Sequence, residues 1–252
     1  MISPAKMIAK FKIRAHARYV PFTTNYLGFP CQVIDKSSFL SMSAEIFDRE
    51  IYRFDSEKTN PYIIDCGANI GLSVIFFKRM YLSAEILAFE PDAKAYAALA
   101  KNTTDLSNVR IIQKGLAGMD GQVDFFSEGA DGGRLATDHD TLSRSSIEVT
   151  RLSPFLDKEV DLLKIDIEGS ELEVLRECAN NLGKVSKIFV EYHSLASKAQ
   201  ELGGLLRILK DAGFRYYIES TGVHSTHPFS KIEEHLNYDN QLNIFAYRPF
   251  HE

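Results

Sequence analysis

The spacing of hydrophobic and polar positions changes after the first quarter of the chain. Residues 37–54 carry apolar side chains at near-helical spacing, which predicts a helix, and a polar stretch over 55–60 precedes Pro61. Beyond Pro61, short apolar runs alternate with longer segments of helical periodicity. This break predicts an N-terminal extension or helical cap over 1–58, followed by a main domain over 59–252.

The apolar runs of the main domain have the length of strands, and the segments between them have the length of helices. Buried strands are predicted at 62–66, 85–89, 109–113, 160–165 and 187–192, helices at 71–81, 92–102, 170–180 and 197–212, and further strands at 122–126, 147–150, 214–219 and 243–248. This alternation predicts an α/β fold with a parallel sheet and helices on both faces. Right-handed crossovers then bring the carboxyl ends of the strands to one edge, where ligands of open α/β sheets bind.

The first predicted strand leads into a glycine turn that reads DCGANIG over 65–71. Gly67 and Gly71 allow the backbone to turn tightly and to approach a ligand closely. The turn lacks the middle glycine of the dinucleotide fingerprint. Asp65 adds a carboxylate, which suits a cationic or amine-bearing ligand better than a diphosphate. A purely structural turn is the alternative interpretation.

Glu90 ends the second predicted strand, where a carboxylate is placed to accept hydrogen bonds from both ribose hydroxyls of a nucleoside. Its alternative role is a charge at a helix N-terminus, before Pro91 and Asp92. Together with the glycine turn, Glu90 indicates a nucleoside ligand with no obligatory phosphate. S-adenosylmethionine fits this description. The loop over 114–118, after the third strand, is placed to flank the adenine ring.

Acidic side chains gather where the fourth and fifth parallel strands end. Asp166 and Glu168 follow the fourth strand, and Glu191 and His193 share one face of the fifth. Pairing with Lys164 is the structural alternative for Asp166. We assign His193 as the leading general base toward an acceptor hydroxyl, with Asp166 or Glu191 orienting it.

A metal-assisted mechanism is the second interpretation of the same residues. Asp166, Glu191 and His193 form an oxygen-and-nitrogen set that could hold Mg²⁺ with the acceptor hydroxyls, whereas the leading hypothesis expects no metal. Glu171 is expected to be only a first-turn acid of the following helix. The loops over 129–140 and 221–237 are expected to cover the acceptor.

Four segments together resemble the FkbM-type S-adenosylmethionine-dependent methyltransferases. They read IIDCGANIGLS over 63–73, AFEPD over 88–92, LLKIDIEGSELEVL over 162–175 and VEYH over 190–193. The resemblance implies a Rossmann-like class I methyltransferase fold, with a seven-stranded, mostly parallel sheet whose last strand is antiparallel. It also implies an O-methyltransferase that uses S-adenosyl-L-methionine, releases S-adenosyl-L-homocysteine and acts on a hydroxyl of a sugar, glycan or natural product.

The motifs and strand ends yield two sets of candidate site residues. The cofactor-binding set is Asp65, Gly67, Ala68, Asn69, Gly71, Ser73, Glu90, Pro91, Lys114, Gly115, Leu116 and Asp166. The catalytic set, on the acceptor side, is His193, Asp166, Glu191 and Glu168. Residues 1–42 and 221–240 match no part of the family pattern.

Composition limits the kinds of partner and the cellular compartment that we expect for this chain. The 252 residues are 45% hydrophobic and 25% charged, with a net charge of −5, so the chain is globular and has no global basic field for nucleic acid. Cys31, Cys66 and Cys178 form no CxxC pair, which indicates a reducing, cytoplasmic location. No apolar run has the roughly 18–20 residues of a membrane span, so no membrane-crossing helix is expected. The partners expected are a small-molecule or glycan acceptor and, in a homo-oligomer, another copy of the chain.

The N-terminal segment over 1–20 is locally basic. It carries Lys6, Lys10, Lys12, Arg14 and Arg18 and no acidic residue, and it lacks the pattern of a signal peptide. A helix that covers part of the domain is the simpler interpretation. The alternative is a patch that makes weak contact with an anionic membrane surface or a charged acceptor.

Two further classes of function are weighed against methyl transfer. A nicotinamide-dependent oxidoreductase is disfavoured by the missing middle glycine. A non-catalytic binding module would keep the cofactor fold without turnover, and a methyl-transfer assay separates it from the enzymes.

Overall fold

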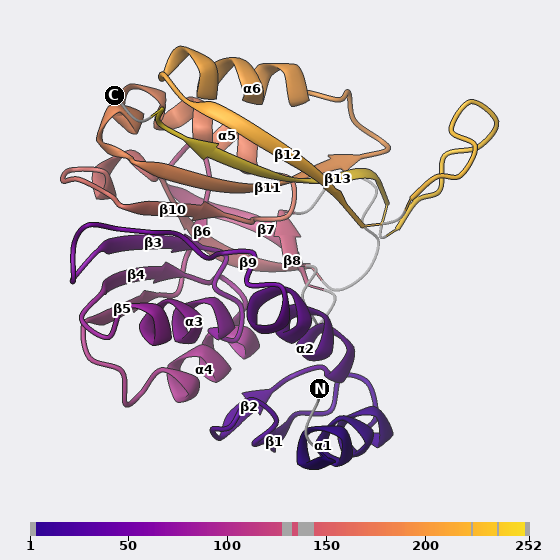
Figure 1. The fold of residues 1–252 in the computed structure, drawn as a ribbon. Coiled ribbons are helices and arrows are strands. Elements are labelled where there is room, and N and C mark those ends of the chain that lie inside the picture. Colours follow the sequence, from indigo (N-terminus) through magenta and orange to yellow (C-terminus); the bar gives the residue numbers. More distant parts are fainter. Residues whose placement is uncertain (1–3, 128–132, 136–143, 223, 236, 250–252) are drawn as a thin grey trace.

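The computed structural model describes residues 4–249 apart from 128–132, 136–143, 223 and 236 (Figure 1). Its main sheet has seven strands in the order β12-β13-β11-β10-β3-β4-β5. In chain order these strands are β3 (Tyr62–Cys66), β4 (Glu85–Phe89), β5 (Val109–Ile112), β10 (Leu162–Ile165), β11 (Lys187–Leu195), β12 (Arg215–Thr221) and β13 (Tyr238–Tyr247). The strand β13 lies antiparallel between β11 and β12, whereas the other pairings that the sheet contains are parallel. The predicted seven-stranded sheet with an antiparallel last strand is therefore confirmed.

Alternation along the buried strands divides the core into two layers, one on each face of the sheet. Ile63 and Ile86 belong to one hydrophobic cluster, while their neighbours Ile64 and Leu87 belong to the other. The first cluster includes side chains of α2 (Lys36–Ser43), α3 (Leu72–Met80) and α4 (Ala93–Asn102), and the second includes those of α5 (Glu171–Glu177) and α6 (Leu202–Asp211). Helices therefore cover both faces, as predicted.

The structure shortens several predicted helices. The segment predicted as one helix over 37–54 is α2 followed by a π-helical turn, η1 (Ala44–Asp48), and it ends where Glu50 adopts a positive φ of 53°. The helix predicted from residue 197 begins only at Leu202, because β11 runs on to Leu195. The helix predicted over 170–180 ends at Glu177 and is followed by a 3₁₀ turn, η3 (Ala179–Lys184).

A second, four-stranded sheet follows β5, in the order β6-β9-β7-β8. Its strands are β6 (Gly115–Leu116), β7 (Gly121–Ser127), β8 (Gly133–Leu135) and β9 (Arg144–Thr150). The strands predicted at 122–126 and 147–150 are confirmed as antiparallel partners. Most of the predicted acceptor loop over 129–140 lies outside the described residues, and its described part is β8.

The N-terminal elements pack on the α2–α3 side of the sheet. They are α1 (Pro4–Ala15) and a hairpin of β1 (Phe22–Thr24) and β2 (Cys31–Val33). Ile13 of α1 and Phe39 of α2 are buried in the same cluster as Ile63 of β3. No helix among the described residues is both long and apolar enough to cross a membrane.

The carboxyl ends of β3 and β10 touch through a glycine. Gly67 has a φ of +85°, and a Cβ atom at this position would lie 1.8 Å from the carbonyl oxygen of Asp166. Only glycine fits this close approach of two loops. The predicted turn therefore brings the strand ends that carry the candidate residues against one another.

Candidate functional site

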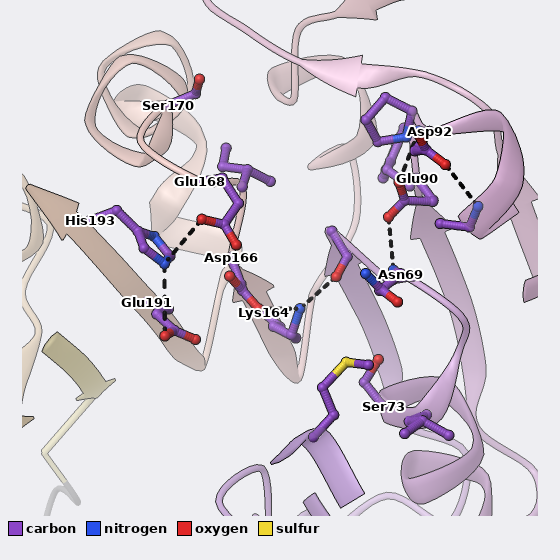
Figure 2. Close-up of a pocket in the computed structure, with 18 of the residues that line it drawn as sticks. Asn69, Ser73, Glu90, Asp92, Lys164, Asp166, Glu168, Ser170, Glu191 and His193 are labelled. Atoms are coloured by element: carbon purple, nitrogen blue, oxygen red, sulfur yellow. Dashed lines mark hydrogen bonds and ion pairs between the residues drawn. The ribbon is translucent and has the colours of Figure 1, made fainter. Parts of the chain in front are cut away.

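A cavity of about 610 Å³ lies at the carboxyl edge of the main sheet. This volume is within the roughly 300–1,000 Å³ typical of small-molecule sites. All the predicted site residues line it except Asp65 and Gly71. Figure 2 shows the glycine-turn side with Asn69 and Glu90 facing the side formed by Asp166, Glu168, Glu191 and His193. One cavity therefore joins the predicted cofactor residues to the predicted acceptor residues.

Glu90 is fixed at the end of β4 by two backbone amides. The amide of Asn69 donates to its Oε2 at 2.8 Å, and the amide of Asp92 donates to its Oε1 at 2.9 Å. Burial raises the pKa of the Glu90 carboxyl to about 7, against the lowering effect of these hydrogen bonds. Each carboxylate oxygen keeps a second lone pair, so Glu90 can still accept from a ligand in the cavity.

The wall beyond Glu90 is apolar. It is formed by Leu116, Phe125 and Ile147, and Gly115 packs so closely on Ile147 that an added Cβ would lie 3.1 Å from its Cδ1. Lys114, at the rim, pairs with Glu148 at 3.0 Å. This wall is of the kind that packs against a flat apolar ring, and Leu116 is its one member from the predicted loop over 114–118.

Asp65 is buried and does not line the cavity. Its Oδ1 lies 3.1 Å from Lys164 Nζ, and its Oδ2 accepts from Ser73 Oγ at 2.5 Å. The sequence predicted a cationic ligand as the partner of Asp65, but its positive partner is Lys164 of β10. Asp65 supports the glycine turn from behind.

Lys164 contacts both the glycine turn and the acidic loop that follows β10. Its side chain is 2% exposed, and Nζ donates to the carbonyl oxygen of Gly67 at 2.8 Å. Nζ also lies 3.4 Å from Asp166 Oδ2. Burial acts to lower the pKa of Lys164, but Asp65 and the groups around it raise that pKa well above its usual range. Asp166 pairs with Lys164, as the structural alternative expected, and it also lines the cavity.

His193 is buried at the acceptor end, next to three carboxyl groups. Its Nε2 lies 3.4 Å from Glu168 Oε2 and 3.7 Å from Glu191 Oε1 (Figure 2). Glu168 has a positive φ of 55°, and its Oε2 accepts from Tyr238 Oη at 3.0 Å. The strand pairing of β11 with β13 therefore helps to aim the acidic loop at the imidazole.

Glu171 holds the imidazole from the other side, a role that the sequence did not reveal. Its Oε1 lies 3.0 Å from His193 Nδ1 and accepts from the amide of Gly169 at 2.9 Å. Both side chains are almost fully buried, at 2% and 1% exposure. The closest carboxyl partner of His193 is therefore Glu171, whereas the sequence favoured Asp166 or Glu191. Acidic residues are common in the first turn of a helix, where they stabilise the helix dipole, so the sequence gave no sign that Glu171 contacts His193.

The groups around His193 retain protons to unusually high pH. Burial, followed by repulsion from Asp166, raises the pKa of Glu191 to about 8. Burial also raises the pKa of Glu168 to about 7, although the charge of His193 acts to lower it. Burial acts to lower the pKa of His193, but Glu168, Glu171 and Glu191 together raise it well above its ordinary value. The neighbouring carboxyl groups therefore favour the protonated form of the imidazole.

Asp166, Glu191 and His193 each offer a ligand atom within 4.8 Å of the others. This is the set that the metal-assisted interpretation requires. Oxygen ligands suit Mg²⁺, but metal binding would have to displace the protons held on Glu191 and His193.

Elements outside the predicted set complete the walls. Met42 comes from α2, Glu45 from η1 and Arg49 from the position after η1. The end of β12 contributes Thr221 and the next residue is Gly222, both within the predicted loop over 221–237. Arg49 Nη2 pairs with Glu219 Oε1 at 2.6 Å and so joins these two walls. The N-terminal segments carried no recognisable chemistry in the sequence, so the contributions of Met42, Glu45 and Arg49 were missed.

Comparisons with known proteins agree with this arrangement. Residues 65–216 match the family model described as the Methyltransferase FkbM domain. The chain is 33% identical over 178 residues to the Methyltransferase sdnD of Sordaria araneosa, a match that covers 52% of this chain and 66% of sdnD. It is 27% identical over 157 residues to the 2-O-methyltransferase NoeI of Sinorhizobium fredii, covering 54% of this chain and 65% of NoeI. The chain thus spans just under two thirds of the length of these relatives.

A solved structure shares the fold. The crystal structure of Methyltransferase FkbM from Methylobacillus flagellatus KT matches with a TM-score of 0.50 and 22% sequence identity, over 80% of this chain and 47% of that chain. At this identity the likeness concerns the fold alone.

The Lys164→Met variant should lower the free energy of unfolding by about 3–5 kcal/mol, because it leaves Asp65 buried without its cation. Urea denaturation measures this loss. The double variant Asp65→Asn with Lys164→Met should regain part of it, and Lys158→Met, at an exposed ion pair with Glu85, serves as control. A loss under about 1 kcal/mol, like that of a surface pair, would contradict the buried role.

Raised carboxyl pKa values predict that the folded protein is less stable at alkaline pH. Between about pH 4.5 and 8 the folded state binds more protons than the unfolded state, on Glu90, Glu168 and Glu191, so the free energy of unfolding falls as pH rises. The Glu191→Gln variant should flatten this fall, by about 1 kcal/mol or more between about pH 6 and 9. Urea denaturation at both pH values tests this, with the exposed Glu57→Gln as control. An unchanged pH dependence in Glu191→Gln would refute the raised pKa of Glu191.

Proposed function

The chain belongs to the FkbM methyltransferase family, and from this premise we propose that it is an S-adenosylmethionine-dependent O-methyltransferase acting on a hydroxyl of a sugar, glycan or natural product. Its seven-stranded sheet has the Rossmann-like class I methyltransferase fold that the sequence predicted. The observation that carries the proposal is the single cavity shared by Glu90 and the His193 cluster. A donor and an acceptor can meet inside it.

The donor half fits a nucleoside that carries positive charge. Glu90 offers carboxylate lone pairs to a ribose diol, and the wall of Leu116, Phe125 and Ile147 offers apolar contact to adenine. Asn69 and Asp166 line the space between Glu90 and the acceptor cluster. When bound there, S-adenosylmethionine would supply a methyl group activated by the sulfonium charge. The carboxylate of Asp166 favours that charge.

The acceptor half is suited to hydroxyl groups. Carboxylates accept hydrogen bonds from hydroxyls, and Asp166, Glu168 and Glu191 line this part of the cavity. The name of the relative NoeI, a 2-O-methyltransferase, supports an oxygen acceptor. The acidic lining favours a neutral acceptor such as a sugar hydroxyl over an anionic one.

Proton removal falls to the His193 cluster. With S-adenosylmethionine bound, the acceptor oxygen would take the methyl group from sulfur, and the hydroxyl proton would pass to the cluster. Because the neighbouring carboxyl groups raise the pKa of His193, the proton acceptor would be one of these carboxylates or the imidazole after it has lost its own proton. Glu171 fixes the ring through Nδ1 and leaves Nε2 toward the acceptor. Alignment of the reacting atoms supplies the larger part of the rate enhancement.

The N-terminal segments are also part of this proposal, as a cap over the cavity. We treat residues 1–58 as a cap on the domain over 59–252, because Met42, Glu45 and Arg49 reach the cavity. Acceptor choice would depend on these walls. A cytoplasmic location stays a prediction, supported by three buried cysteines that form no disulfide.

Metal-assisted transfer is a second candidate, favoured by the close grouping of Asp166, Glu191 and His193. Protons compete with a metal ion for these ligands, because the pKa values of Glu191 and His193 are raised.

The Glu90→Gln variant should bind S-adenosylmethionine about 10–100-fold more weakly, since hydrogen bonds to a charged acceptor contribute about 1.5–3 kcal/mol. Wild-type affinity should also fall below about pH 7, where the raised pKa of Glu90 lets the carboxyl take up a proton. Calorimetry at pH values on both sides of 7 measures both effects. Equal affinity of wild type and Glu90→Gln would reject the ribose assignment, and no binding by the folded wild type would reject the proposed function.

The His193→Gln variant should lower kcat by about 10²–10⁴-fold, with little change in affinity for S-adenosylmethionine. The wild-type rate should rise with pH through an apparent pKa above 6.5, because the carboxyl groups raise the pKa of His193. Steady-state kinetics across pH, with a thermal melt of the variant, test this. A folded variant with near-normal kcat would contradict a role of His193 in proton removal.

Chelation separates the two mechanisms within the same assay. EDTA should leave the wild-type rate unchanged under the leading proposal. A rate that is lost in EDTA and restored by Mg²⁺ would assign Asp166, Glu191 and His193 to the metal instead.

A further inference from the structure

The helix α1 has two apolar faces, and only one of them is covered. Its inner face includes Ile13, which is 2% exposed, and Ala9, which packs against the same core cluster. Lys6 also turns inward, because its Nζ pairs with Asp48 at 2.9 Å. α1 is held by its contacts with α2 and lies at the outer edge of the molecule (Figure 1).

The opposite face of α1 presents large apolar side chains to solvent. Met7 is 61% exposed, Ile8 59% and Phe11 76%. At 3.6 residues per turn these three side chains share one face, about half a turn away from Ala9 and Ile13. Three large apolar residues grouped on one exposed helix face form a contiguous patch of the kind that marks a binding surface.

Cationic side chains border this patch on both sides. Lys10 and Arg14 follow one edge with a spacing of four residues, and Lys12 lies on the other edge. Lys36 adds a further cation at the end of α1, where its Nζ donates to the carbonyl oxygen of Arg14 at 2.8 Å. The helix itself contains no acidic residue, although the whole chain has a net charge of −5.

We propose that α1 docks flat on an anionic lipid surface, with Met7, Ile8 and Phe11 entering the interface and Lys10, Lys12 and Arg14 meeting the headgroups. An apolar ridge with cations on both sides is the arrangement by which interfacial helices bind membranes. Such binding is peripheral, in keeping with the lack of a membrane-crossing helix among the described residues. The proposal is independent of the chemistry in the cavity.

Other occupants fit the face less well. Two copies of α1 packed through this face would bring their cationic borders against each other. Duplex nucleic acid would attract the cations but gives no apolar environment to Phe11, which points away from the protein. An anionic membrane provides both the charge and the apolar layer.

Co-sedimentation of the full chain with vesicles tests the proposal. The protein should bind phosphatidylcholine vesicles that contain phosphatidylserine, bind pure phosphatidylcholine vesicles weakly, and dissociate as salt is raised. The double variant Ile8→Ser with Phe11→Ser should lower the partition coefficient at least tenfold, because it removes two buried apolar groups from the interface. The double variant Lys12→Gln with Arg14→Gln should lower it about fivefold for each charge removed.

Matched controls keep the outcome specific to α1. Leu82→Ser removes an 80% exposed apolar side chain elsewhere, and Lys94→Gln with Lys101→Gln removes two exposed cations of α4, and neither should change vesicle binding. Thermal melts and S-adenosylhomocysteine binding should be unaffected in all four variants. The proposal fails if anionic vesicles do not bind the wild type, or if the α1 and control variants bind alike. A concentration-dependent dimer abolished by Phe11→Ser, without vesicle binding, would assign the face to a second copy.

Discussion

The buried ammonium group of Lys164 is the interaction on which the site depends. It lies between Asp65, at the end of β3, and Asp166, just after β10, and it also holds the carbonyl oxygen of Gly67. A buried charge is tolerated only when its partners compensate the loss of water. The same partners define the glycine turn on one side and the acidic loop on the other. The geometry of both halves of the cavity is therefore tied to one buried cation in its lining.

At the acceptor end of the cavity, bound protons rather than a lysine compensate the buried acidic groups. Glu168, Glu171 and Glu191 surround His193, and burial raises the pKa of Glu168 to about 7 and that of Glu191 to about 8. Glu168 and Glu191 both lie next to the imidazole of His193, so these two carboxyl groups and the imidazole do not lose their protons independently. Such a cluster can accept a proton near neutral pH without a large change in net charge. This property suits the removal of a proton from an alcohol as it is methylated.

The parts that the sequence predicted well are those governed by local pattern. The apolar run over 62–66 predicted the strand β3, and the glycine turn predicted at Gly67 corresponds to a backbone contact that excludes every side chain. Glu171 escaped notice because its burial against His193 is a tertiary property that its helical position does not reveal. The same reason applies to η1, whose contribution to the cavity depends on how α2 packs across the end of the sheet.

The most direct test of the account is a crystal structure with S-adenosylhomocysteine bound. The account predicts that the ribose hydroxyls lie within hydrogen-bond distance of Glu90, that the adenine packs on Leu116 and Ile147, and that the sulfur faces Asp166 and His193. A ligand bound in the opposite direction, with the adenine against His193, would contradict the assignment of donor and acceptor halves. So would a sulfur directed away from the acidic cluster.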